Sequence, residues 1–107
     1  MKFLVIGKPA RTAQFTAKQR LAMMQASKEW QEAYLKNGTV DCAYAFIDGG
    51  GFTISNYDTA EDALKAVINF PANALFEWDV KPLADMIKTY DEVISIFKRY
   101  AEAEQGD

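Results

Sequence analysis

The segment from Gly50 to Leu83 constrains the fold more than any other part of the chain. Residues 52–56 and 76–81 have the pattern of strands, and the residues between them have the pattern of a helix. Thr59 and its acidic neighbours favour the start of that helix, where side-chain oxygens cap free amides and negative charge suits the helix dipole. Pro71 ends it. The segment therefore predicts a compact strand–helix–strand unit with almost no spare residues.

The first half of the chain predicts a second unit of the same kind. Lys2–Gly7 is a nearly continuous apolar run, typical of a central strand. Thr16 with Gln19 has the capping-box pattern, and the amphipathic helix that follows is expected to end at Asn37-Gly38. The predicted apolar face of this helix is Met23, Ala26, Trp30 and Ala33, and that of the second helix is Ala63, Leu64, Val67 and Ile68. A strand is predicted at 40–47. One of its sides carries Val40, Cys42, Tyr44 and Phe46, and the other carries Asp41, Ala43, Ala45 and Ile47.

Three consecutive glycines, Gly49 to Gly51, separate the strand at 40–47 from the strand at 52–56. A glycine-rich loop can bind phosphate, but such loops lead into a helix N-terminus and end in Lys-Ser or Lys-Thr. This loop leads into a strand and lacks that ending. It is therefore predicted to be the turn of an antiparallel hairpin.

The C-terminal residues, 84–107, form an extension to a core of residues 1–83 within one predicted domain spanning 1–107. Apolar residues from Leu83 to Ala101 recur at helical spacing. The pair Thr89 and Glu92 predicts that a helix begins there, after a short separate turn. The polar tail after Ala101 is expected to fray.

The predicted order of elements is strand, helix, strand, strand, helix, strand and a terminal helix. Two right-handed split units place the first and third strands at the centre of the sheet and both helices on one face. The predicted fold class is therefore α+β, a ferredoxin-like βαββαβ arrangement with an additional C-terminal helix. The opposite face of the sheet has no helix to cover it.

The uncovered sheet face is expected to be too apolar to remain in water, because the first two strands carry apolar residues on both sides. We therefore predict a homodimer, or a higher oligomer of dimers, in which sheets pack together and enclose a mixed cavity. The terminal helix, with Met86, Ile87, Tyr90 and Phe97, would then strap the partner subunit. In the alternative, it folds over its own sheet in a monomer.

Composition excludes several functions. The net charge is -3 with acids and bases interspersed, so neither a nucleic acid nor an anionic membrane is an expected partner. The chain has no histidine, which removes the commonest general base and metal ligand. A single cysteine, Cys42, and the lack of a signal or membrane segment predict a cytoplasmic protein.

The segment from Gly50 to Leu83 resembles the muconolactone isomerase-like group of the dimeric α+β barrel superfamily. A weaker resemblance covers Phe3-Leu4-Val5 and the helix end from Trp30 to Gly38. The motifs that carry it are the strand Phe52-Thr53-Ile54-Ser55, Tyr57-Asp58 before a helix start at Thr59 and Asp62, Leu64 in the helix, the stop Asn69-Phe70-Pro71 and the strand Phe76-Glu77-Trp78-Asp79-Val80.

The resemblance implies a dimeric α+β barrel and a cofactor-independent isomerase-like protein that acts on or binds a small apolar lactone or enolisable carbonyl compound. It implies no metal. Relatives in the wider superfamily are cofactorless monooxygenases and ligand-binding proteins. This chain departs from the group by lacking histidine and by extending through residues 85–107.

Isomerisation without a cofactor needs a base beside an acidic carbon and donors that stabilise an enolate. If the helices cover the aromatic side of the last strand, the charged residues on its other side face the cavity between subunits. Burial would then raise the pKa of a carboxylate there towards the working range. The candidates are Glu77 and Asp79 as general bases, Tyr44 and Ser55 as hydrogen-bond donors to a carbonyl, and Lys81 or Arg11 as partners of a substrate carboxylate.

Two other interpretations stay open. Alternating Glu, Asp and Lys on a strand are also typical of a solvated face or of cross-strand ion pairs, which would leave a non-catalytic dimeric module that binds a small ligand or serves a structural role. A cofactorless monooxygenase, with Trp78 and Tyr44 lining its pocket, is the third possibility. No cofactor is expected in any of them.

Overall fold

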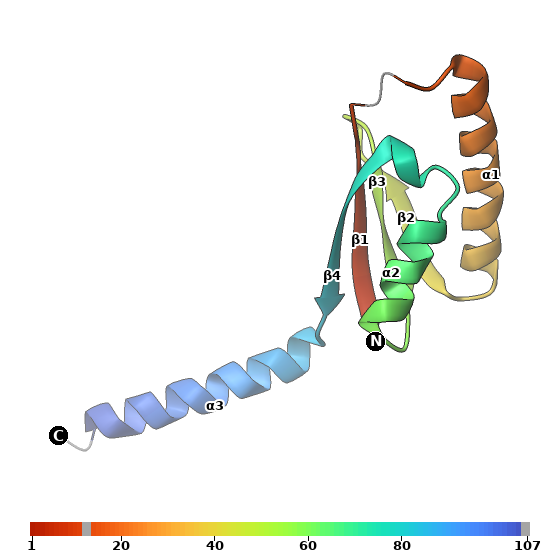
Figure 1. Ribbon diagram of the computed structural model, residues 1–107. Helices are drawn as coiled ribbons and strands as arrows, with labels where there is room; N and C mark the ends of the chain where they lie inside the picture. Colours follow the sequence, from red (N-terminus) through yellow and green to blue (C-terminus); the bar gives the residue numbers. More distant parts are fainter. Residues whose placement is uncertain (12–13, 106–107) are drawn as a thin grey trace.

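The computed structural model describes residues 1–11 and 14–105. Its elements are β1 (Lys2–Pro9), α1 (Ala17–Lys36), β2 (Val40–Ala45), β3 (Gly51–Asn56), α2 (Ala60–Asn69), the short 3-10 helix η1 (Asn73–Leu75), β4 (Phe76–Leu83) and α3 (Met86–Gln105). This is the predicted βαββαβ order with one additional C-terminal helix (Figure 1). The ferredoxin-like α+β class is confirmed.

The four strands form one antiparallel sheet in the order β2-β3-β1-β4, so the first and third strands are central as predicted. Val5 lies opposite Thr53 on one side and Val80 on the other, and these three side chains point to the same face. Ile6 lies opposite Phe52 and Asp79 on the other face. The register therefore decides which residues meet the helices and which do not.

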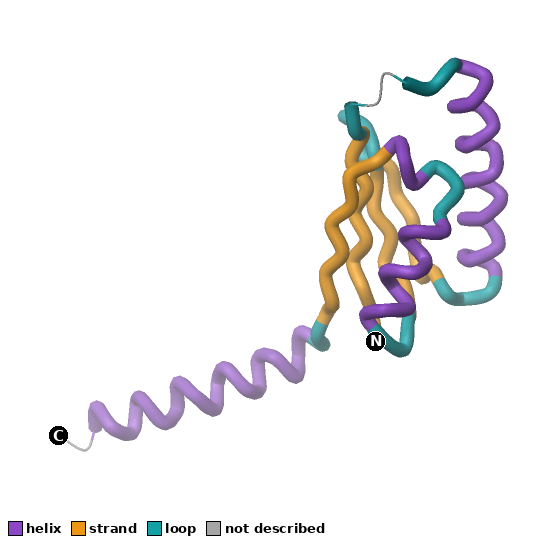
Figure 2. Tube along the Cα trace, in the orientation of Figure 1, coloured by secondary structure: helices purple, strands orange, loops and turns teal. Residues whose placement is uncertain are grey.

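Helices α1 and α2 both cover one face of the sheet and leave the other uncovered (Figures 1 and 2). Helix α1 begins with the predicted capping box, in which Thr16 and Gln19 bond each other's backbone amides. Helix α2 begins at the predicted cap, where the Thr59 hydroxyl accepts from the Asp62 amide at 3.1 Å. Both helix starts follow from local side-chain chemistry.

Helix α2 packs closely on the sheet. Ala63 and Val67 are buried against Phe3 and Val5 of β1, and Tyr57, Trp78 and Val80 pack around this cluster. The prediction that Leu64 and Ile68 also face inwards is wrong, because they are 56% and 63% exposed. A ten-residue helix on a flat sheet buries only a narrow stripe, so the neighbouring apolar positions remain in solvent.

Helix α1 meets the sheet differently. Its one buried residue is polar Ser27, whereas Met23 and Trp30 are half-buried. The predicted apolar face is wrong at Ala26 and Ala33, which are exposed. The helix is therefore rotated from the face that its apolar residues indicate, and Ser27 points towards the sheet.

Strand β2 departs from simple alternation. Its register against β3 shifts between Val40 and Cys42, so Val40 lies opposite Ser55 on the helix-covered face while Cys42 lies opposite Ile54 on the other. The prediction that Val40 shares a face with Cys42 and Tyr44 is therefore wrong. The strand also ends at Ala45, so Phe46 lies in the hairpin turn, where its amide donates to the Gly50 carbonyl.

Helix α3 is continuous from Met86, so the predicted start at Thr89 is wrong. Asp85 caps it instead: its side chain accepts from the Lys88 amide at 2.9 Å, and its carbonyl accepts from the Thr89 hydroxyl. The helix runs to Gln105, beyond the point where fraying was expected. Within the described residues, neither α3 nor any other helix is long and apolar enough to cross a membrane.

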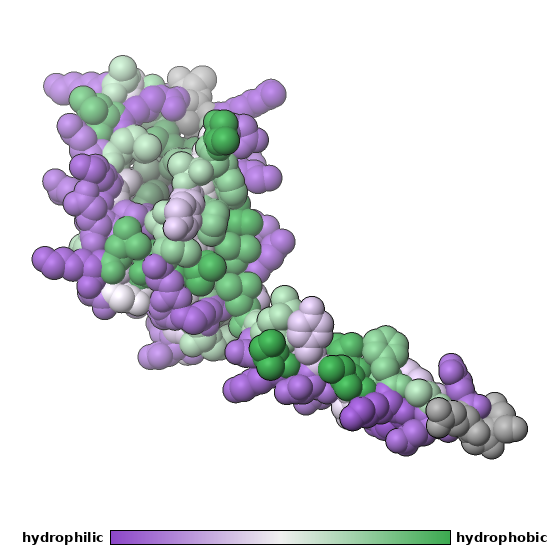
Figure 3. Space-filling view, turned by 180° about the vertical axis from the view of Figure 1, so that it is seen from behind, coloured by the Kyte–Doolittle hydropathy of each residue, from purple (hydrophilic) through white to green (hydrophobic). Residues whose placement is uncertain are grey.

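Helix α3 projects away from the rest of the protein and does not fold over its own sheet (Figure 1). The protein measures 71 × 30 × 25 Å with a radius of gyration of 19.5 Å, whereas a compact chain of this length has about 13 Å. The apolar side chains of α3 form a row along one side of this helix, visible in Figure 3. Members of this row, all exposed, are Met86, Ile87, Tyr90, Val93, Ile94, Phe97 and Tyr100.

Candidate functional site

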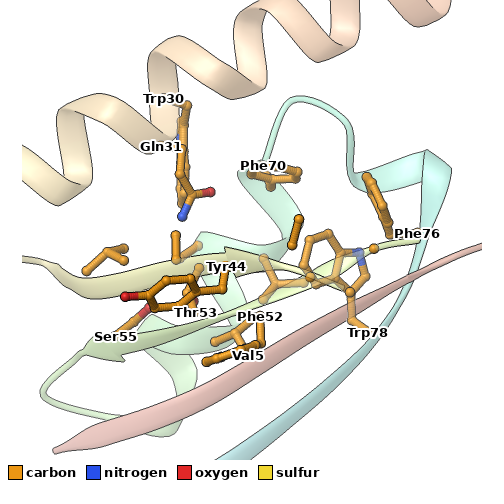
Figure 4. A pocket seen from close by; sticks show the side chains of 18 of the residues that line it. Val5, Trp30, Gln31, Tyr44, Phe52, Thr53, Ser55, Phe70, Phe76 and Trp78 are labelled. Atoms are coloured by element: carbon orange, nitrogen blue, oxygen red, sulfur yellow. The ribbon is translucent and has the colours of Figure 1, made fainter. Parts of the chain in front are cut away.

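A cavity of about 370 Å³ lies between the helices and the sheet (Figure 4). We call it the helix-side cavity. Its walls come from α1, α2, the segment after α2 and the helix-covered face of all four strands. It occupies the place where α1 would meet the sheet if α1 packed as α2 does. Its principal lining residues are Val5, Trp30, Gln31, Val40, Ala43, Thr53, Ser55, Tyr57, Phe70, Phe76 and Trp78.

Aromatic rings form one end of this cavity. Phe70 stands edge-on to Trp30 and to Trp78, with ring centroids 5.2 and 5.4 Å apart, and Phe76 lies 5.6 Å from Trp78. The Trp78 indole donates to the Asn73 carbonyl at 3.3 Å, which fixes its orientation. These contacts hold a rigid apolar wall against which a flat molecule could pack.

The Trp78 ring lies directly over Gly7. A Cβ atom added at Gly7 would come within 3.0 Å of the ring, so a larger residue would push the indole out of place. Because Gly7 has no side chain, the Trp78 ring can lie close against β1, and this position fixes where the aromatic wall of the cavity stands.

Hydroxyl groups lie on the β3 side of the cavity. Thr53 and Ser55 are hydrogen-bonded through their hydroxyls at 2.8 Å, and Ser55 is 1% exposed. Burial raises the pKa of the neighbouring Tyr57 above its ordinary value of 10.0, Tyr34 adds to this, and a hydrogen bond with Ser55 opposes it. Tyr57 therefore keeps its proton at neutral pH and can donate a hydrogen bond to a ligand oxygen.

Two buried polar atoms on α1, Ser27 Oγ and Gln31 Nε2, have no hydrogen-bond partner among the described residues. The two residues are one turn apart on the side of α1 that faces the sheet. Figure 4 shows the Gln31 side chain pointing from α1 into the cavity. Unpaired buried donors are rare in folded proteins, because each one loses its hydration without compensation.

The charged residues of the chain lie elsewhere. Among the described residues that line the helix-side cavity there is no Asp, Glu, Lys or Arg. Within the described part of the chain, no group of three or more His, Cys, Asp or Glu side chains could hold a metal ion. The described lining of the cavity is therefore mostly apolar with a few neutral polar groups, and it offers no carboxylate as a base.

The predicted bases lie on the other side of the sheet. Glu77 and Asp79 point away from the helices as expected, and both are exposed in the subunit. Lys81 Nζ lies 3.4 Å from Asp79 Oδ2 within the same strand, so this ion pair is not the cross-strand pair of the alternative interpretation, whereas the exposure of these side chains agrees with its solvated face. Such an exposed pair contributes little to stability.

The other predicted residues do not converge on these carboxylates. Tyr44 shares the uncovered face, where its ring lies 5.9 Å from that of Phe52. However, β2 and β4 are the two edge strands, so three strand spacings of about 4.8 Å, or roughly 14 Å, separate Tyr44 from Glu77. Arg11 is exposed beyond the end of β1.

Tyr44 and Ser55 both line the helix-side cavity (Figure 4). Ser55 is buried on the helix-covered face at 1% exposed, whereas Tyr44 comes from the edge strand β2 and is 65% exposed. Sequence reasoning missed Gln31, Tyr57 and Trp30 as cavity residues. One signal was available: Ser27 and Gln31, four residues apart, place polar groups on the side of α1 that should be apolar.

Fold and cavity together define a ferredoxin-like α+β protein with a hollow between its first helix and its sheet. No protein-family model matches the sequence, and no curated protein matches it. Solved structures do match in fold. The crystal structure of muconolactone isomerase aligns with a TM-score of 0.71 at 13% identity, over 79% of this chain and 90% of that chain.

A second solved structure is 5-chloro-2-hydroxyhydroquinone dehydrochlorinase (TftG) from Burkholderia phenoliruptrix, in complex with 2,5-dihydroxybenzoquinone. It aligns with a TM-score of 0.56 at 16% identity, over 78% of this chain and 94% of that chain. At these identities the likeness is one of fold. The predicted structural resemblance to muconolactone isomerase is confirmed at that level.

Proposed function

We propose that this protein binds a small, largely apolar carbonyl compound in the helix-side cavity. The observation that carries the proposal is the cavity itself, about 370 Å³ bounded by aromatic rings and a few hydroxyl groups. Folded interiors leave few voids larger than a water molecule, and an unfilled void lowers stability. Its size and lining match the usual form of a small-molecule site, which is mostly apolar with a few convergent polar groups.

The hydroxyl side of the cavity favours a carbonyl ligand. Tyr57 is protonated at neutral pH, as its ordinary pKa of 10.0 already ensures and burial reinforces, and it lies beside the hydrogen-bonded pair Thr53 and Ser55. Together these groups can donate to a ligand oxygen. The likeness in fold to muconolactone isomerase supports a lactone or another enolisable carbonyl compound as the ligand class.

Intrinsic fluorescence tests the proposal directly, because both tryptophans of the chain, Trp30 and Trp78, line the cavity. Titration with a panel of neutral lactones and cyclic ketones is expected to shift or quench the emission and to raise the melting temperature. The control is Ala43→Leu, which fills the cavity from β2 and should abolish the response. Unchanged emission and melting temperature across the whole panel would refute the proposal.

A second candidate function is isomerisation with Glu77 as the base. It is favoured by the position of Glu77 and Asp79 on the uncovered sheet face, which a second copy of the chain would enclose. Enclosure would raise a carboxylate pKa towards neutrality. The test is exchange of substrate-carbon protons with deuterated solvent: an enzyme accelerates it, and Glu77→Gln should reduce the rate at least a hundredfold. Equal rates in both proteins would exclude Glu77.

We also propose that a second copy covers the two unpartnered apolar surfaces. One is the uncovered sheet face, where Leu4, Ile6, Phe52 and Ile54 lie side by side. The other is the row of exposed apolar side chains along α3. Helix α3 follows directly after β4 and projects away from its own sheet (Figure 1). Monomeric proteins rarely expose apolar surfaces of this extent. A two-fold homodimer would bury both, each subunit supplying the same surfaces.

Light scattering of the full chain tests the dimer. We expect twice the subunit mass at micromolar concentration, and a shift towards the monomer in Ile87→Ser/Phe97→Ser, which interrupts the α3 row. The matched control is Lys88→Ser, on the same helix but outside the row. A wild-type monomer at micromolar concentration would remove the homodimer and, with it, the enclosed site for Glu77.

A further inference from the structure

We infer that the ligand of the helix-side cavity is uncharged, flat and conjugated, and that it carries an acceptor oxygen bonded by Gln31 Nε2. This inference rests on the proposed binding function. It assigns Gln31 as the residue that selects the ligand, a role distinct from that of the hydroxyl groups on β3. The two polar sites lie on different walls of the cavity, Gln31 on α1 and the hydroxyls on the sheet.

The state of the Gln31 amide carries the argument. Its Nε2 atom is buried, finds no hydrogen-bond partner in the part of the chain that the structure describes, and belongs to a side chain that points into the cavity (Figure 4). An amide donor in that state has lost its hydration and gained nothing, which costs about 1–3 kcal/mol. A ligand oxygen that accepts from Nε2 removes that cost. Since –NH₂ only donates, the ligand atom that meets it must be an acceptor.

The ligand's charge follows from what the cavity lacks. No Lys or Arg is present among the described residues that line it. A carboxylate or phosphate placed between Trp30, Phe70 and Trp78 would lose its hydration without a cationic partner. A neutral carbonyl, lactone or ether oxygen needs only the neutral donors that are present.

The shape of the ligand follows from the walls. The rings of Trp30, Phe70, Phe76 and Trp78 contact one another at centroid distances of 5.2 to 6.5 Å and close one end of the cavity. Rings arranged in this way offer both faces and edges to a further ring. A planar conjugated molecule therefore gains more contact here than a bulky aliphatic one.

Three probes of similar shape separate these features: coumarin, a flat neutral lactone; naphthalene, which lacks the oxygen; and coumarin-3-carboxylate, which adds the charge. Binding of each is measured by calorimetry and tryptophan quenching in the wild type, in Gln31→Leu and in the control Gln25→Leu, an exposed position of the same helix. We expect Gln31→Leu to weaken coumarin about fivefold to tenfold relative to naphthalene, Gln25→Leu to match the wild type, and the carboxylate to bind at least tenfold more weakly than coumarin.

The stability of the variant shows that lost binding is not lost folding. Replacing an unpaired buried amide by leucine is expected to leave the melting temperature of Gln31→Leu equal to or above that of the wild type. Equal weakening of coumarin and naphthalene, or carboxylate binding as tight as that of coumarin, would overturn this inference while leaving the binding function intact. No response to any of the three probes in the wild type would count against the binding function itself.

Discussion

The two helices that cover the sheet differ in what they bury against it. Helix α2 buries Ala63 and Val67 against Phe3 and Val5, and these residues form the core of the protein. Helix α1 is twice as long, at 20 residues against 10, yet buries one serine. The space that α1 leaves is the helix-side cavity. One fold thus contains a packed half that stabilises it and a hollow half, where we propose that the ligand binds.

This difference matches the general conflict between stability and function. Larger apolar residues at Gln31 and Ala43 would stabilise the α1 side but would also fill the cavity, so the polar and small residues found there suit the proposed binding function. We therefore expect the same kind of substitution to change the free energy of unfolding differently in the packed half and in the hollow half.

The largest expected effect is in the packed half. Phe3→Ala removes a ring that is 1% exposed at the centre of the core, and we expect it to lower the free energy of unfolding by about 3–5 kcal/mol. Phe76→Ala, beside the cavity and half-buried, should cost less than half of that. Urea denaturation of both variants makes the comparison, and Phe3→Leu replaces Phe3→Ala if the latter does not fold. Equal losses would show that both halves are packed alike.

Next in size is the pair of enlargements Ala63→Leu and Ala43→Leu. Ala63 is a fully buried residue on the sheet side of α2, so the added carbons have no space and should lower the free energy of unfolding by about 1–3 kcal/mol. Ala43 borders the cavity, so the same carbons enter open space and should leave the stability unchanged or slightly raised. Chemical denaturation measures both. A similar loss in the two variants would mean that the hollow does not persist in solution.

A smaller, stabilising effect is expected at Ser27. Ser27→Ala removes a buried hydroxyl without a partner and improves helix propensity, which together should raise the free energy of unfolding by about 1 kcal/mol. The control Gln25→Ala lies on the exposed side of the same helix and reports propensity alone, a few tenths of a kcal/mol. If Ser27→Ala destabilises the protein, its hydroxyl has a hydrogen-bond partner in solution, and the α1 side is better satisfied than the structure indicates.

The packed half was largely predictable from sequence, because its signals are local. Thr59 caps α2, Pro71 follows it, and Trp78 and Val80 alternate along β4 towards the core beneath α2. The antiparallel order of strands then follows from short connections and right-handed crossovers. The start of α3 was also local, but Asp85 was passed over in favour of Thr89.

The hollow half was not predictable from sequence. Its cavity depends on how far α1 stands from the sheet, which no periodicity encodes, and on the register shift between Val40 and Cys42, which moves Val40 onto the cavity face. Ser55 and Tyr44 were named as site residues and both line the cavity, but their setting between α1 and the sheet could not be read from simple alternation. Glu77 lies on the sheet face away from the helices, where the sequence pattern put it if the aromatic residues of β4 face the helices.

The smallest effect concerns Tyr57, which packs against the core and also lines the cavity. Burial raises its pKa above 10.0 in the folded protein, so folding favours the protonated phenol. A raised folded-state pKa stabilises fully below the unfolded pKa, and that contribution is lost as the pH rises through the folded value. The free energy of unfolding of the wild type should therefore fall more steeply above about pH 10 than that of Tyr57→Phe. Denaturation at pH 7, 9 and 10.5 measures the slopes, with Tyr90→Phe on exposed α3 as the control. If the free energy of unfolding falls with pH at the same rate in the wild type and in Tyr57→Phe, the phenol is in contact with water. The border between the packed and hollow halves would then lie deeper in the protein, between Tyr57 and Ser55.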